Sequence, residues 1–198
     1  MNEEQPELTK KERQELRRRE KKTSQELQRK NKILKKYFVW IISFIVIGGG
    51  LYGLVLIAQK SEDSRPGQVI PIQGEEHISE NSPLPEYNSN PPTSGPHAGP
   101  VRGGFYSSEI KDINAVHNLE HGFIWITYKN VDEETIGKLE KIGQQFTGSV
   151  IISLREVNDS NIAIASWGRL EKMDVFDEEF AINFIKKNKN KSPEQLAR

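Results

Sequence analysis

The chain has 198 residues and a formal net charge of zero, with 28 Lys and Arg residues against 28 Asp and Glu residues. It contains no cysteine, which excludes disulfide bonds and thiolate metal sites. The zero net charge hides an asymmetry, because residues 1–36 carry 13 Lys and Arg against 7 Glu, a net charge of +6, and the remainder carries −6. This split indicates parts with different surroundings.

The first 36 residues are rich in Glu, Lys, Arg, Gln and Leu and contain no Gly or Pro after Pro6, which predicts a charged helix. Their apolar residues do not sustain a seven-residue repeat, which argues against a coiled coil. A basic segment beside a membrane helix typically contacts anionic lipid head groups. We expect that contact here, rather than nucleic acid.

Residues 37–59 contain no Asp, Glu, Lys, Arg or His and are almost continuously apolar. At about 1.5 Å of rise per residue, a helix of this length crosses the ~30 Å hydrocarbon layer of a bilayer. Lysines crowd the N-terminal side, so the positive-inside rule predicts a cytoplasmic N-terminus and an extracytoplasmic C-terminal domain on the cell membrane. A cleaved signal peptide is the alternative, but residues 57–60 make a poor cleavage site.

Within this predicted span, Gly49 and Gly53 form a G-x-x-x-G pair. Such a pair lets two helix backbones approach closely, which predicts a homodimer through this helix face. The alternative is that glycine is simply common in membrane helices.

After a predicted linker at residues 60–67, residues 68–198 have the size of one domain. Residues 68–72 are predicted as a short edge strand, because Pro71 cannot donate to a sheet. Residues 81–104 contain six prolines and four glycines, which fits a linker. Prolines also restrict the backbone of residues 90–97 strongly, and we interpret this segment as an ordered loop that positions His97.

The rest of the domain has clearer periodicity. Strands are predicted at residues 123–128, 149–154 and 161–167, the last two joined by a hairpin-like turn at residues 156–160. Apolar residues at helical spacing predict a helix from Asp132 to Phe146 and a last helix capped by Asp177 or Asp174. We therefore expect a small α/β or α+β domain, with a mixed sheet and helices packed on one face of it. No phosphate-binding glycine fingerprint is present.

The strongest chemical signal is the segment His117-Asn118-Leu119-Glu120-His121, which reads H-x-x-E-H. The two histidines are four residues apart, so they point to the same side whether the segment is a strand or a helix. Glu120 joins them only on a helix. His97, in the proline-rich loop, is the natural third imidazole.

Three imidazoles form a compact site for a transition metal ion, and for nitrogen ligands the affinity order favours copper, with zinc as the alternative. Glu120 or Glu109 offers a fourth ligand, and Met173 offers a soft ligand for cuprous copper. The alternative is that the histidines are hydrogen-bonded residues that hold the loop on the sheet. His77, flanked by Glu75 and Glu76, is interpreted as a surface residue outside the site.

H-x-x-E-H is also the signature of the inverzincin metalloproteases, in which two histidines bind zinc and the glutamate activates water. These enzymes need a larger framework and a further distant ligand, so a metal-dependent hydrolase ranks third among our hypotheses. No serine has the sequence context of a nucleophile elbow. We assign no catalytic residue.

Several separated motifs, in this order, resemble the bacterial family of unknown function DUF3105 over roughly residues 65–195: Asn90–His97 after Tyr87, Gly104–Tyr106, Val116–Gly122, Ala165–Arg169 and Ser192–Glu194. The resemblance implies a membrane-tethered extracytoplasmic domain without an assigned reaction. Its histidine-bearing motifs match at His97, His117 and His121, with Glu120 between the last two. The chain departs from the family at residues 98–103, where we expect a segment that contains tryptophan.

The leading hypothesis from the sequence is a single-pass membrane protein whose outer domain binds copper or zinc through His97, His117, His121 and Glu120. Its role would be metal handling or sensing. The alternative is a structural or protein-interaction domain of the cell envelope that binds no metal.

Overall fold

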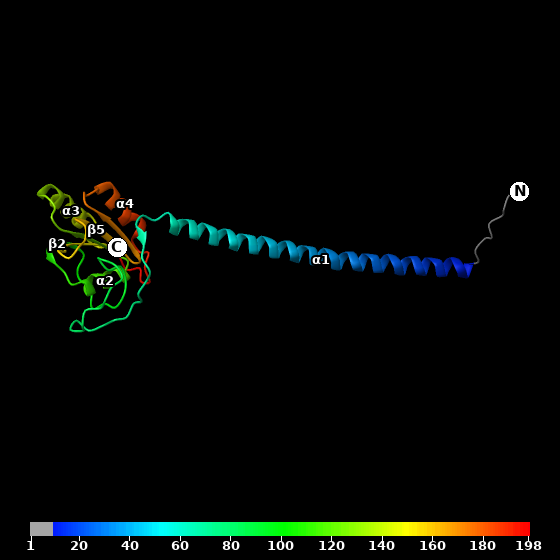
Figure 1. The fold of residues 1–198 in the computed structure, drawn as a ribbon. Helices are drawn as coiled ribbons and strands as arrows, with labels where there is room; N and C mark the ends of the chain where they lie inside the picture. The colour runs from blue at the N-terminus through cyan, green and yellow to red at the C-terminus, as the bar shows by residue number, and fades with distance from the viewer. Residues whose placement is uncertain (1–9) are drawn as a thin grey trace. The chain divides into compact units, whose positions relative to one another are not determined.

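The computed structural model describes residues 10–198 of the chain (Figure 1). The described chain divides after Asp63 into two compact units. The first unit is a single helix, α1 (Lys10–Asp63), and the second is a domain that comprises residues 64–198.

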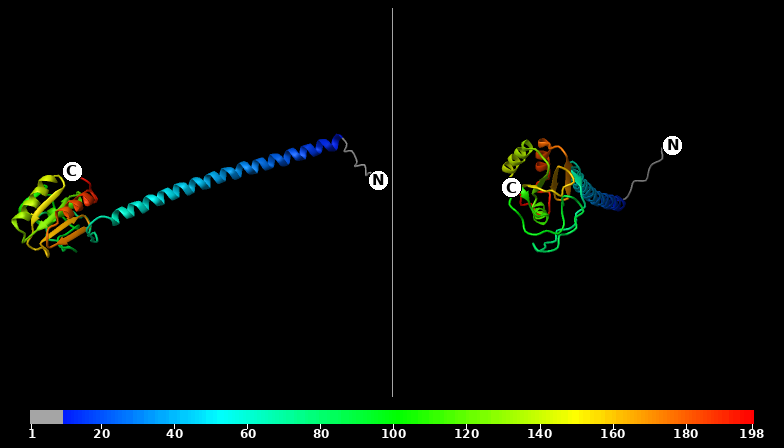
Figure 2. Two further views of the ribbon diagram at one scale, coloured as in Figure 1. Left: turned by 90° about the horizontal axis from the view of Figure 1, so that it is seen from above. Right: turned by 60° about the vertical axis from the view of Figure 1, so that its left-hand side comes forward.

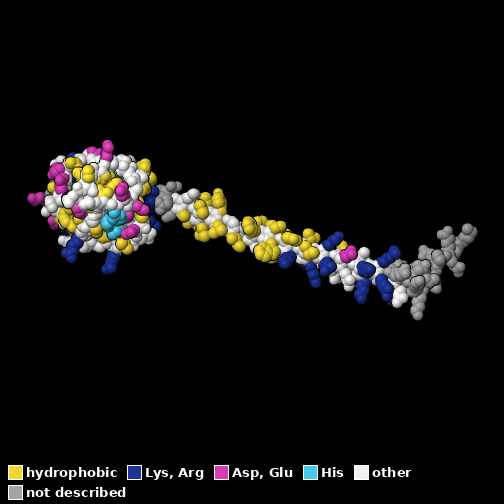
Figure 3. All heavy atoms as spheres, turned by 90° about the horizontal axis from the view of Figure 1, so that it is seen from below, with side chains coloured by type: hydrophobic (Ala, Val, Ile, Leu, Met, Phe, Trp, Pro, Cys, Tyr) yellow, Lys and Arg dark blue, Asp and Glu magenta, His cyan; other side chains and the backbone are white. Residues whose placement is uncertain are grey.

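Helix α1 contains residues 10–36 of the predicted charged segment and the whole predicted membrane span without a break, while residues 1–9 of that segment lie outside the described residues. Among the described residues, its part from Arg17 to Lys60 is the one helix long and apolar enough to cross a membrane. Figure 3 shows hydrophobic side chains surrounding one length of the helix and Lys and Arg side chains gathered on the length before it. The helix continues as far as Asp63 into the segment predicted as a linker, and the first proline after it is Pro66.

The second unit is a six-stranded mixed sheet with three helices. In chain order, its elements are β1 (Gln68–Val69), β2 (Gly104–Glu109), α2 (Asp112–Glu120), β3 (Ile124–Tyr128), α3 (Glu133–Gln145), β4 (Val150–Leu154), β5 (Ile162–Ser166), β6 (Arg169–Met173) and α4 (Glu178–Asn188). The strand order across the sheet is β1-β6-β5-β3-β4-β2. The predicted α+β class is confirmed, and β1 lies at the edge as expected.

The predicted hairpin between residues 149–154 and 161–167 is wrong, because β4 and β5 are not neighbours. Strand β3 lies between them, parallel to β4 and antiparallel to β5. The reason is α3, which returns the chain to the starting end of β3 so that the next strand pairs in parallel. The chain then crosses to the other edge of β3, where β5 pairs with it. Strands β2 and β6, whose exposed faces are polar, were not predicted.

The side chains of β3 alternate between two hydrophobic cores. Ile124 and Ile126 point into a core formed with α3 and α4, whose members include Leu139 and Phe184. Trp125 points to the opposite face, where α2 packs with Leu119. Figures 1 and 2 show α3 and α4 together on one side of the sheet and α2 on the other. The two helices that the sequence predicted therefore lie on one face of the sheet as expected, whereas α2, which the sequence left open as helix or strand, covers the other face.

The two long helices of the domain begin where their sequences predict. Asp132 caps α3 by accepting a hydrogen bond from the backbone N–H of Thr135 at 2.8 Å. Asp177 caps α4 by accepting from the backbone N–H of Phe180 at 2.9 Å, which decides between the two predicted caps.

Candidate metal centre

One wall of the site is the proline-rich loop, which is fixed by backbone hydrogen bonds. Gly95 N–H donates to Gly74 O at 3.0 Å, His97 N–H donates to Glu76 O at 2.9 Å, and Ile78 N–H donates to His97 O at 2.8 Å. These bonds form a short parallel bridge that places His77 directly beside His97. The ordered loop predicted from the prolines therefore has an unpredicted neighbour, the segment at residues 74–78.

The opposite wall is α2, which carries the H-x-x-E-H segment in its last turns. Ala115, Val116 and Leu119 bury one side of this short helix against the sheet. Because the segment is a helix and not a strand, Glu120 turns toward the same space as His117. The sequence had left both possibilities open.

The two walls bring four side chains together: His77, His97, His117 and Glu120. One ligand atom from each lies within 4.8 Å of the ligand atoms of the other three. The ring centroid of His97 lies 4.5 Å from that of His77 and 5.0 Å from that of His117. Transition metals bind nitrogen and oxygen at ~2.0–2.2 Å. The ligand atoms of the four residues, all within 4.8 Å of one another, are therefore close to the separations that one ion can bridge.

Both ring nitrogens of His97, which is completely buried, lie within hydrogen-bonding distance of another residue. Its Nδ1–H donates to Gly95 O at 2.8 Å, since a carbonyl can only accept. Its Nε2 lies 3.1 Å from Glu120 Oε2, which is also 3.8 Å from His77 Nε2. A histidine that binds a metal ion through one ring nitrogen usually donates a hydrogen bond from the other to a carbonyl or carboxylate oxygen, which orients the ring. A metal ion bound at His97 Nε2 would take the place of this contact with Glu120.

The structure also leaves one buried nitrogen unsatisfied. His117 is 8% exposed, and its Nδ1 has no hydrogen-bond partner among residues 10–198. Burial, followed by the proximity of His121, lowers the pKa of His117, while a backbone contact with Ala98 acts in the opposite direction. A neutral imidazole with an unpartnered nitrogen is the form that binds metal ions, so the chemistry of this residue fits a ligand.

His121 lies next to this cluster but has a different partner. Its ring centroid is 4.4 Å from that of His117, and its Nε2 is 2.9 Å from Glu194 Oε2. Ligand atoms of Glu120, His121 and Glu194 again lie within 4.8 Å of one another. His121 therefore shares a second group of ligands with Glu120.

The structure thus brings together His97, His117 and Glu120 as predicted, places His121 beside them, and adds two residues that the sequence analysis missed. His77 is exposed, as expected of a surface residue, but it belongs to the cluster. Glu194 had one available signal, its position in the last motif of the family resemblance. Glu109 does not reach the cluster, because its carboxylate accepts from the backbone N–H of Glu156.

Met173, the predicted soft ligand, packs against the core between the sheet and α3 and α4. Two of the four histidines, His77 and His121, reach the surface, and Figure 3 shows a histidine patch on the domain with acidic side chains beside it. Each of the two groups therefore includes a histidine that solvent reaches.

The model of the DUF3105 family, described as proteins of unknown function, matches residues 77–198, which is more than half of the chain. The chain belongs to the DUF3105 family. The DUF3105 match begins at His77 and includes every member of both ligand groups, while α1 lies outside it. No curated protein and no solved structure matches the chain.

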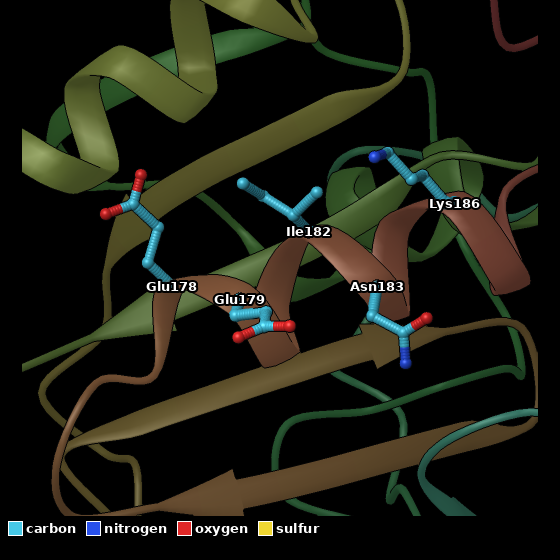
Figure 4. Close-up of a pocket in the computed structure, with 5 residues that line it drawn as sticks. All are labelled: Glu178, Glu179, Ile182, Asn183 and Lys186. Carbon is cyan, nitrogen blue, oxygen red and sulfur yellow. The ribbon is translucent and has the colours of Figure 1, made fainter.

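Outside the histidine cluster of this DUF3105 domain, a shallow surface hollow lies along α4. It is lined by Glu178, Glu179, Ile182, Asn183 and Lys186. Figure 4 shows these side chains pointing in different directions rather than toward one centre. The hollow has no histidine, and its side chains do not converge on a common point.

The lowered pKa of His117 predicts a pH dependence of stability. In the metal-free protein, the free energy of unfolding is expected to fall as the pH drops below 6.5, the ordinary pKa of this group. As the pH falls, the unfolded chain takes up a proton at His117 before the folded chain does, and the loss of unfolding free energy is complete below the pKa of the folded state. Above pH 6.5 the side chain is neutral in both states, so it does not make the free energy of unfolding depend on pH.

Denaturant unfolding in the presence of a chelator, from about pH 8 to about pH 5, measures this slope. The variant His117→Asn, which cannot take up a proton, is expected to have a flatter dependence than the natural chain over the same range. Equal slopes for the two proteins would contradict the assignment.

Proposed function

We propose that the domain binds a divalent transition metal ion, copper or zinc, through His97, His117, Glu120 and His77. The observation that carries the proposal is the convergence of imidazoles from two distant stretches, on either side of a buried carboxylate, with one buried nitrogen left unpartnered. A set of three nitrogens and one oxygen suits both metals, and copper binds the more tightly of the two.

We further propose that α1 tethers this domain to the cell membrane, with the N-terminus in the cytoplasm and the domain outside. The apolar length of α1 and the positive charge before it support this arrangement. The basic segment would contact anionic lipid head groups, and Gly49 and Gly53, which have open space beside them, would allow a homodimer. A metal site outside the cytoplasm serves metal handling or sensing.

The test is metal binding by the full-length protein, purified in detergent without a histidine tag and freed of metal with a chelator. We expect Zn²⁺ and Cu²⁺ to bind and to raise the melting temperature. At a free ion concentration of 100 times Kd, the stabilisation is about 2.7 kcal/mol. His97→Ala and His117→Ala should each weaken Zn²⁺ binding by more than about 100-fold, because each removes a proposed metal ligand rather than a residue that only hydrogen-bonds to a ligand.

Glu109→Gln is the matched control, since it neutralises a carboxylate of the same domain that does not belong to the cluster. This variant is expected to keep the Zn²⁺ affinity of the natural chain. A protein that binds neither ion, with a melting temperature unchanged by both, would contradict the proposal. It would support the alternative in which the histidines only hold the loop in place as part of a structural or interaction domain.

A further inference from the structure

Resting on the metal site proposed above, we propose that the centre holds two metal ions and that Glu120 is shared between them. The first ion would lie among His77, His97 and His117. The second would lie between His121 and Glu194. The chain would then present a carboxylate-bridged pair of divalent transition metal ions.

The first support is that Glu120 belongs to both ligand groups. Its ligand atom is within 4.8 Å of those of the three histidines on one side and of His121 and Glu194 on the other. A carboxylate has two oxygens and about four lone-pair positions, so it can serve two ions at once. Its burial, at 3% exposure, limits its movement between the two groups.

The second support is the spacing of the two groups along α2. His117 belongs to the first group and His121 to the second, and their ring centroids are 4.4 Å apart. Ions in two-metal sites lie ~3.5–4 Å apart. These neighbouring imidazoles at the C-terminal end of α2 therefore offer one nitrogen ligand to each of two adjacent ions.

The third support is the way in which the C-terminal tail holds Glu194. The backbone N–H of Glu194 donates to Glu120 O at 3.1 Å. The backbone N–H groups of Leu196 and Ala197 donate to His121 O at 3.0 and 3.1 Å. Asn190 holds the tail from the other side, because its side chain exchanges hydrogen bonds with the backbone of Ala197. The tail thus fixes a carboxylate beside His121 before any ion binds.

Charge is the fourth support. Two divalent ions bring four positive charges, and Glu120 alone could offset only one of them. Glu194 supplies a second carboxylate, and it is 51% exposed, so water or hydroxide could complete the coordination. His121 Nε2 lies 2.9 Å from Glu194 Oε2, and an ion bound between these two residues would take the place of that contact.

The experiment is a Zn²⁺ titration of the chelator-treated, untagged full-length protein in detergent, with the bound metal counted per chain after gel filtration. We expect two Zn²⁺ per chain for the natural sequence. Glu194→Gln is expected to bind one Zn²⁺, with the affinity of the first site changed by less than about tenfold. Glu140→Gln, which neutralises an exposed carboxylate on α3, is the matched control and should still bind two.

A second readout reports whether the ions are close together. Loaded with Cu²⁺, the natural chain should show magnetic coupling between two ions in its electron paramagnetic resonance spectrum, and Glu194→Gln should show the signal of an isolated ion. One ion per chain in the natural protein, unaffected by Glu194→Gln, would overturn the shared centre and leave the single-metal proposal standing. No bound ion at all would overturn both.

Discussion

Replacing Arg155 by Met is expected to lower the free energy of unfolding of the domain by about 3–5 kcal/mol, the usual cost of breaking a buried ion pair from one side. Arg155 follows β4 directly, and its side chain is 7% exposed. Its Nε and a terminal nitrogen donate to the two carboxylate oxygens of Asp112 at 2.9 and 2.8 Å, a bidentate pair at the first residue of α2.

The same guanidinium holds two more segments. It donates to Asn158 Oδ1 at 2.8 Å and to the side chain of Asn90, which lies in the proline-rich loop before His97. It also lies over the ring of Trp125, 5.8 Å from the centroid. One side chain therefore joins the sheet, the start of α2 and the loop, which are the elements that position the candidate metal centre.

Denaturant unfolding followed by the fluorescence of Trp125 and Trp167 measures the effect. Arg155→Lys should recover only part of the loss, because an ammonium group cannot form the bidentate pair. The matched control is Lys172→Met, which breaks the exposed pair with Asp159 and should change the stability by less than about 1 kcal/mol. Similar losses of unfolding free energy for Arg155→Met and Lys172→Met would show that the buried contacts of Arg155 stabilise the domain no more than an exposed ion pair does.

Replacing Gly122 by Ala is expected to cost about 2–4 kcal/mol, from backbone strain and steric overlap together. Gly122 has a φ of +86°, a region that disfavours side chains. A β-carbon added there would lie 2.4 Å from Asn190 Oδ1 and 2.8 Å from Asn190 Cα. Asn190 cannot easily retreat, because its side chain is bonded to Ala197 in both directions.

The matched control for this variant is Gly137→Ala. Gly137 lies within α3, and an added β-carbon would meet nothing within 4 Å. Since alanine favours helix over glycine, this change is expected to stabilise the domain by as much as about 1 kcal/mol. The two variants should thus shift the midpoint of denaturant unfolding in opposite directions. A neutral Gly122→Ala would show that the tail does not pack closely on the end of α2.

The elements that the sequence predicted correctly are those with strong local signals. The helix capped by Asp132, the helix capped by Asp177 and the strand predicted at residues 123–128, which the structure gives as 124–128, each combine periodic apolar residues with a recognisable boundary. Strand β6 was missed because two of its five residues are the charged Glu171 and Lys172, and its pairing with β5 decides its conformation more than its composition does.

The pairing of β4 and β5 was the clearest error about topology. Residues 156–160 look like a hairpin turn in the sequence, but each strand finds an edge of β3 instead. Strand β3 is buried along its whole length, with apolar side chains on both faces. A central strand of this kind forms more buried contacts with two neighbours than an isolated hairpin forms by itself.

For the candidate site, the sequence by itself determined the residue types, the shared side of His117 and His121, and the restricted backbone before His97. The four-residue spacing of His117 and His121 guarantees a shared side in any regular structure, and the rigid loop indicates that His97 is held in place. Because these properties depend on neighbours in the chain, they are readable without a fold.

Only the tertiary structure decided which other groups join them. His77 reaches the cluster through backbone pairing between residues 74–78 and 95–97, and Glu194 reaches it because the C-terminal tail bonds to the end of α2. Both contacts join segments that are distant in sequence, and backbone hydrogen bonds leave little trace in the identity of the side chains. Local patterns therefore indicated the candidate ligands on α2 and in the loop, whereas long-range pairing brought His77 and Glu194 beside them.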